Sequence, residues 1–107
     1  MGRYLFQGSY SLDGVKGVLK EGGSGRRRAV QDAIKSLGGK LESFYFAFGE
    51  TDVYVIVDGI DHEQAAAFSL GVGATGGLHN LKTTVLLTAE EIDAAAKKTL
   101  SYRAPGH

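Results

Sequence analysis

The residues best suited to acid–base chemistry are one histidine and two neighbouring carboxylates. His79, in the segment GGLHNLKTT, has an unperturbed pKa near neutrality, as a general base at physiological pH requires. Glu50 and Asp52, in the segment GETD, could perform acid–base work or hold a hard metal ion. Glycine and aspartate are also the residues that a hairpin turn selects, with Asp52 accepting hydrogen bonds from the hairpin's own amides. We favour this structural role for the carboxylates.

Three consecutive arginines follow a glycine-rich break in KEGGSGRRRAVQDAI, residues 20–34. A Walker phosphate loop needs a lysine and a hydroxyl residue after its glycines, and none follows here. The dinucleotide-binding fingerprint fails because Arg28 occupies its third glycine position. A helix dipole disfavours each cation in a first turn by about 0.3–1 kcal/mol, so Arg26, Arg27 and Arg28 are candidate contacts for an anion or a partner's carboxylate. A solvated start of a helix is the plainer interpretation.

Composition excludes several functional classes. The 107 residues include no cysteine, which rules out disulfides, thiolate zinc sites, iron–sulfur clusters and cysteine nucleophiles. Lys+Arg and Asp+Glu both number 12, and this balance argues against a dedicated nucleic-acid binder. No pair of histidines has metal-ligand spacing, so we expect neither a metal nor a cofactor. The N-terminal MGRYLFQGSYS is too polar for a signal peptide or a membrane span, and we expect a cytoplasmic protein without a membrane partner.

Hydrophobic periodicity and glycine breaks predict the elements that position these residues. Alternating apolar residues predict four strands, over residues 4–10, 41–48, 53–57 and 81–87. Helices are expected after Ser11, on either side of a break at glycines 22, 23 and 25, and after the N-caps Asp61 and Thr88. The order strand–helix–strand–strand–helix–strand predicts a ferredoxin-like α+β fold, in which a four-stranded antiparallel sheet carries helices on one face. We expect one domain over residues 1–98 and a loose tail over residues 99–107.

The strands over residues 41–48 and 53–57 are apolar on both sides, and strict alternation places Phe44 and Phe46 on the opposite side from Leu41 and Tyr45. Because the helices cover only one face of the sheet, something else must cover the other, and a second copy packed sheet to sheet is the simplest cover. We therefore expect a homodimer or a higher oligomer. If the paired sheets leave a gap, Tyr10, Tyr45, Tyr54 and His79 are candidates to line a pocket for a small apolar or aromatic ligand, with the tyrosine hydroxyls as polar anchors.

Three segments make the chain resemble the GYD family of small bacterial proteins: LGGKLESFYFAFGETDVYVIVDG, DHEQAAAFSLGVGATGG and LKTTVLLTAEEI. That family's signature is Gly-x-Tyr-Asp followed by a valine-rich strand. Gly49, Glu50 and Asp52 match it, whereas Thr51 stands where tyrosine is usual, so any role of the tyrosine hydroxyl is lost here. The resemblance implies a dimeric α/β barrel and no established biochemical function.

Two functions of different class follow from this, and whether the protein is an enzyme stays open. The first is a GYD-type homo-oligomer of undefined biochemical role that binds a small ligand. The second, which rests on fold analogy, is a cofactor-independent oxygenase or isomerase acting on a small, for instance aromatic, substrate in the barrel cavity. His79 would then be its base, although a lone histidine at the start of a strand is more often a surface residue. A third interpretation is an interaction module whose arginines meet an acidic partner.

Overall fold

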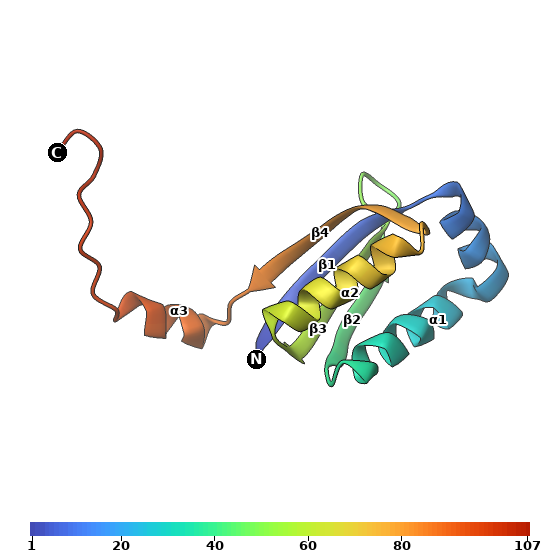
Figure 1. Ribbon diagram of the computed structural model, residues 1–107, viewed down its shortest axis with the longest axis horizontal. Helices are drawn as coiled ribbons and strands as arrows, with labels where there is room; N and C mark the ends of the chain where they lie inside the picture. Colours follow the sequence, from blue (N-terminus) through green and yellow to red (C-terminus); the bar gives the residue numbers. More distant parts are fainter.

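A four-stranded antiparallel sheet carries two long helices on one face, and a third helix lies beyond its end (Figure 1). The computed structural model describes all residues, 1–107. The strands are β1 (Gly2–Tyr10), β2 (Lys40–Phe46), β3 (Val53–Ile60) and β4 (Leu78–Leu86), and the helices are α1 (Leu12–Ser36), α2 (His62–Ala74) and α3 (Ala89–Ala96). The strand order β2-β3-β1-β4, with every neighbouring pair antiparallel, confirms the predicted ferredoxin-like α+β fold. None of the three helices has the length and apolar character that crossing a bilayer requires.

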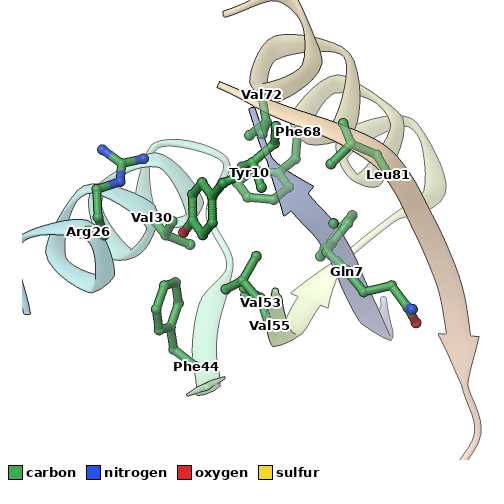
Figure 2. Close-up of a pocket in the computed structure, with 13 residues that line it drawn as sticks. Gln7, Tyr10, Arg26, Val30, Phe44, Val53, Val55, Phe68, Val72 and Leu81 are labelled. Atoms are coloured by element: carbon green, nitrogen blue, oxygen red, sulfur yellow. The ribbon is translucent and has the colours of Figure 1, made fainter. Parts of the chain in front are cut away.

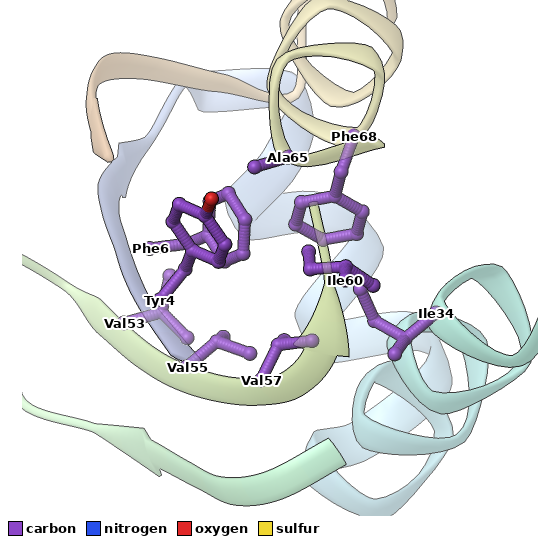
Figure 3. Packing of buried hydrophobic residues seen from close by; sticks show 9 residues of the cluster. All are labelled: Tyr4, Phe6, Ile34, Val53, Val55, Val57, Ile60, Ala65 and Phe68. Carbon is purple, nitrogen blue, oxygen red and sulfur yellow. The ribbon is translucent and has the colours of Figure 1, made fainter. Parts of the chain in front are cut away.

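The core lies between the two central strands and the helices (Figure 3). On β1 the buried residues Tyr4 and Phe6 alternate with less buried ones, and the Phe6 ring meets Phe68 of α2 with centroids 4.7 Å apart. Ile34 of α1 is fully buried on the same side. Burying each such side chain contributes about 1.5–3 kcal/mol, so this alternation holds both helices on one face. The β3 members of the core are Val53, Val55, Val57 and Ile60.

A bulge in β2 changes which of its residues share a face. Leu41 pairs with Val57 and Ser43 with Ile56, so Glu42 has no residue opposite it. Strict alternation places Leu41 on the opposite side from Phe44, and that prediction is wrong. Because a bulge adds one residue to the alternation, Leu41 and Phe44 both pack against the core.

The break within α1 falls at Gly22 alone. This residue has φ +77° and ψ 166°, a conformation that favours glycine, while the glycines that follow it are helical. Residues 23–36 pack on the sheet through Ile34. Residues 12–21 project past it, and Leu19 in that half is 80% exposed. The kink therefore separates a core-bound half of α1 from a half that has an exposed apolar side.

The first turn of α1 is held against the loop that leads into β4. The Ser11 hydroxyl accepts a hydrogen bond from the Gly14 amide at 3.1 Å and donates one to the Gly76 carbonyl at 2.7 Å. The Ser11 amide donates to the Gly77 carbonyl at 2.9 Å. A Cβ atom at Gly14 would overlap the carbonyl oxygen of Gly77, so only glycine lets the backbones approach this closely.

The sheet face opposite the helices is bare. Leu5 pairs with Ile56 and Tyr54 pairs with Tyr45, and all four alternate with residues of the core. The Tyr45 side chain is 70% exposed. We call Leu5, Tyr45, Tyr54 and Ile56 the open face. β3 is thus apolar on both sides, as the sequence indicated, whereas on β1 the polar residues Arg3 and Gln7 flank Leu5 on this face.

Candidate functional site

An apolar pocket lies between the sheet and the two long helices (Figure 2). Its cavity volume is about 60 Å³, and ten of its 13 lining residues are hydrophobic. α1 packs mainly against β2 and α2 mainly against β4, so a small cavity remains between the two helices above the central strands. The lining side chains come from all four strands and both helices: Phe6, Gln7, Gly8, Tyr10, Arg26, Val30, Phe44, Val53, Val55, Phe68, Val72, Leu78 and Leu81.

The polar groups at the rim of this pocket belong to Tyr10 and Arg26. The Tyr10 ring stands at the mouth between α1 and β3, with the Arg26 side chain beside it, whereas the amide of Gln7 points away (Figure 2). Burial raises the pKa of the Tyr10 phenol above its ordinary value, and the positive charge of Arg26 opposes that rise. At neutral pH the rim therefore presents a neutral hydroxyl and a cation.

Arg26 has an incomplete set of partners. Its guanidinium meets the two carboxylate oxygens of Glu21, across the kink at Gly22, at 3.4 and 3.5 Å. Good hydrogen bonds between such ions are about 2.7–2.9 Å long, so this pairing is loose. Arg26 thus finds a carboxylate in its own chain, and it also lies close enough to the Tyr10 hydroxyl to oppose the rise in the pKa of that group. Arg27 and Arg28 are exposed and form no ion pair.

The GETD hairpin positions Tyr10 through Asp52. The Asp52 carboxylate accepts a hydrogen bond from the Tyr10 amide at 2.8 Å, and the Asp52 amide donates to the Gly8 carbonyl at 2.9 Å. The prediction that the Asp52 carboxylate accepts hydrogen bonds from the amides of its own hairpin is wrong. The carboxylate accepts its hydrogen bond from the end of β1 instead. Asp52 does not line the pocket, but it holds the backbone of the tyrosine that does.

Two further contacts tie the same hairpin to β1. The Ser9 hydroxyl donates to the Glu50 carbonyl at 2.9 Å, and the Gln7 side-chain amide donates to the Thr51 hydroxyl at 3.2 Å. Thr51, which stands where the GYD signature has tyrosine, therefore accepts a hydrogen bond from β1. The exposed Glu50 contributes its backbone rather than its carboxylate.

The remaining candidates from the sequence lie outside the pocket. His79 is exposed near the start of β4 and is not among the lining residues. Tyr45 and Tyr54 belong to the open face, on the other side of the sheet from the pocket. Of the four proposed ligand contacts only Tyr10 lines this cavity, and the roles of the other three stay predictions. No three His, Asp or Glu side chains gather closely enough to hold a metal ion.

Among the helical residues of the pocket, the sequence singles out Arg26 alone as a candidate contact, for an anion, and assigns none to Val30, Phe68 or Val72. Arg26 and Val30 are four positions apart on α1, as are Phe68 and Val72 on α2, so each pair shares a helix face. This spacing could have identified Arg26 as the arginine that faces the sheet, and Arg27 and Arg28 as the two that face solvent. Which strand residues those faces meet depends on strand pairings that are remote in sequence.

These features define a class of protein, a ferredoxin-like α+β domain with a single-chain pocket between helices and sheet. The family model described as GYD domain matches residues 4–96, which is most of the chain. The chain therefore belongs to the GYD family. No curated protein shows a significant match to it.

Proposed function

We propose that the protein binds a small apolar carboxylate in the pocket between its helices and sheet, and that it works as a homo-oligomer. The observation that carries the ligand class is the pairing of an almost wholly apolar lining with one loosely paired arginine, Arg26, at the rim. The apolar part of the ligand would enter between Phe68 and Val53. Its carboxylate would meet the Arg26 guanidinium and the Tyr10 hydroxyl.

The size of the cavity limits the ligand. An apolar cavity of about 150 Å³ admits benzene, whereas this one measures about 60 Å³. A short aliphatic chain fits without change, and an aromatic ring enters only if the Tyr10 side chain swings outward. Each buried methylene contributes about 0.8 kcal/mol and a charge-assisted hydrogen bond about 1.5–3 kcal/mol. After the cost of association we expect dissociation constants of about 0.1–1 mM.

Nuclear magnetic resonance titration tests this proposal. Butyrate, hexanoate and benzoate should shift the amide resonances of pocket residues, and the corresponding neutral amides should bind about tenfold more weakly. Arg26→Gln should remove the preference for carboxylates. Arg28→Gln is the matched control, because Arg28 is exposed and lines no cavity. Shifts that cluster on another surface, or equal binding of acids and amides, would contradict the proposed site.

Glu21 supplies a second, opposite test of the same site. Its carboxylate competes with the ligand for Arg26, so Glu21→Gln should tighten binding of hexanoate. A loss of affinity in this variant would mean that the Arg26–Glu21 pair positions the helix rather than competing with the ligand.

The open face supports self-association. Exposing apolar side chains of a sheet to water is unfavourable. Packing the same face of a second copy against them would remove both sets of side chains from water. Ile56→Arg should weaken the assembly. Tyr45→Arg provides the same test at a more exposed position, where the substitution should not disturb folding. Ala66→Arg on the exposed side of α2 is the control for added charge. A wild-type chain that stays monomeric at micromolar concentration in light scattering would refute self-association.

Enzymatic turnover by His79 is the less supported function. A general base must lie within hydrogen-bond reach of the proton that it removes. His79 does not line the pocket, so this pocket supports binding rather than base catalysis by that residue.

A further inference from the structure

α3 is a well-capped helix without a packing partner. The Thr88 hydroxyl accepts from the Glu91 amide at 3.1 Å and the Glu91 carboxylate accepts from the Thr88 amide at 2.9 Å, yet no residue of α3 is buried. Isolated helices shorter than about 12–15 residues are marginal in water, and α3 has eight. The radius of gyration of the chain is 16.9 Å, against about 13 Å for a compact domain of this size. The helix therefore needs a surface to pack on.

The apolar stripe of α3 has a defined spacing and an acidic border. Ala89, Ile92 and Ala96 lie at positions i, i+3 and i+7, and therefore share one face. Glu90 and Asp93 are exposed beside this stripe and form no ion pair. A surface that fits α3 should thus be apolar in its centre and basic at its edge.

The first half of α1 is such a surface. Leu12, Val15 and Leu19 repeat the spacing i, i+3 and i+7, and all three side chains are exposed. Lys16 and Lys20 lie beside them, exposed and without an ion-pair partner. The two stripes therefore match in spacing, and Glu90 and Asp93 can meet Lys16 and Lys20, although Asp13 also borders the α1 stripe and Lys97 follows α3.

The two stripes cannot meet within one chain. They lie at opposite ends of a molecule whose longest dimension is 57 Å (Figure 1). Only Leu87 separates the end of β4 from the N-cap Thr88, which leaves little freedom for α3 to fold back. We propose that α3 of one copy packs against the first half of α1 in a second copy.

Two such contacts close a symmetric pair. If the first copy's α3 covers the second copy's α1, a two-fold axis makes the second copy's α3 cover the first copy's α1, and no stripe remains exposed. The inference shares with the proposed function only the requirement for a second copy of the chain. The surface that it assigns to the contact is separate from the open face. It also places the tail beyond α3 next to the partner.

Sedimentation equilibrium of full-length variants tests the contact. Ile92→Glu introduces a charge into the stripe and should weaken self-association by at least about tenfold. Ala94→Glu adds the same charge to the other side of α3 and should change it by less than about twofold. Equal effects of the two substitutions would overturn the inference. If Tyr45→Arg dissociates the copies while Ile92→Glu does nothing, the open-face assembly stands and the α3 contact fails.

Disulfide trapping gives a direct readout, because the chain has no native cysteine. A mixture of Val15→Cys chains and Ile92→Cys chains should form a mixed disulfide dimer on mild oxidation. A mixture of Val15→Cys and Ala94→Cys chains should form far less. Equal yields from the two mixtures would overturn the proposal, as would a monomeric internal disulfide in the chain that carries both Val15→Cys and Ile92→Cys.

Discussion

The carboxylate of Asp52 accepts a hydrogen bond of 2.8 Å from the backbone amide of Tyr10. This bond joins the hairpin between β2 and β3 to the last residue of β1, which is also the residue whose ring stands at the pocket mouth. A residue of the GYD signature thus acts on the pocket through the backbone of another strand. Positioning, rather than ligand contact, is the role that this geometry gives to Asp52.

Substitutions of Asp52 should distinguish the contribution of its hydrogen bond to stability from the contribution of its negative charge. Asp52→Asn keeps an acceptor for the Tyr10 amide and should cost little, whereas Asp52→Ala leaves that amide unpaired and should cost about 0.5–2 kcal/mol of unfolding free energy. Urea unfolding of both variants measures the difference. If asparagine destabilises as much as alanine, the negative charge itself is required.

The close approach at Gly14 makes a matched pair of glycine substitutions informative. Gly14→Ala would force a Cβ atom into the Gly77 carbonyl and should destabilise the protein by about 1–3 kcal/mol. Gly17 lies in the same helix with open space around it, so Gly17→Ala should stabilise by about 0.5–1 kcal/mol. Thermal melts distinguish the two, and a stabilising Gly14→Ala would mean that the α1–loop contact is absent in solution.

Arg26 and Arg27 should respond differently to charge reversal. Arg27 is exposed near the start of the second half of α1, so Arg27→Glu should leave stability unchanged or raise it slightly through the helix dipole. Arg26→Glu places a second carboxylate beside Glu21 and should abolish the preference for carboxylate ligands. A loss above about 1 kcal/mol in Arg27→Glu would show that Arg27 has an anionic partner.

Tyr10 should make the protein sensitive to alkaline pH. Its pKa is raised in the folded state, chiefly by burial, so the folded chain holds this proton more tightly than the unfolded chain. The corresponding stability is fully present below the ordinary tyrosine pKa of about 10 and is lost as the pH rises through the raised value. Tyr10→Phe should therefore lose less stability than the wild type above about pH 10. Tyr102→Phe, in the exposed tail, should behave like the wild type in the same urea titrations.

The fold could be predicted because its signals are local. Thr88 and Glu91 are three residues apart, and the capping box that this spacing predicts is present. The alternation of Val53, Val55 and Val57 likewise places them on the buried side of β3. The bulge at Glu42 carries no such local signal, because it depends on which β3 residues β2 pairs with, and strict alternation therefore predicts the wrong side for Leu41.

The pocket could not be predicted because it is built from remote pairings. Tyr10 and Asp52 are brought together by the pairing of β1 with β3, and Arg26 joins them because α1 kinks at Gly22. Each residue has a chemistry of its own that the sequence shows, but nothing local indicates that the hydroxyl and the cation share one rim. The sequence pattern placed the gap between paired sheets, whereas the cavity lies on the helix side of a single sheet.

The central place of β1 has a consequence for how the chain folds during its synthesis. β1 leaves the ribosome before the other strands, yet Tyr4 pairs with Val57 on one side and with Val85 on the other. Closing such long loops is slow, because chain entropy is lost before the new contacts compensate for it. Only the β2–β3 hairpin and the helices can form early from neighbouring residues. One edge of β1 can pair once β3 has been made, but the other edge must wait unpaired for β4, and this interval is when the nascent protein is most exposed to aggregation.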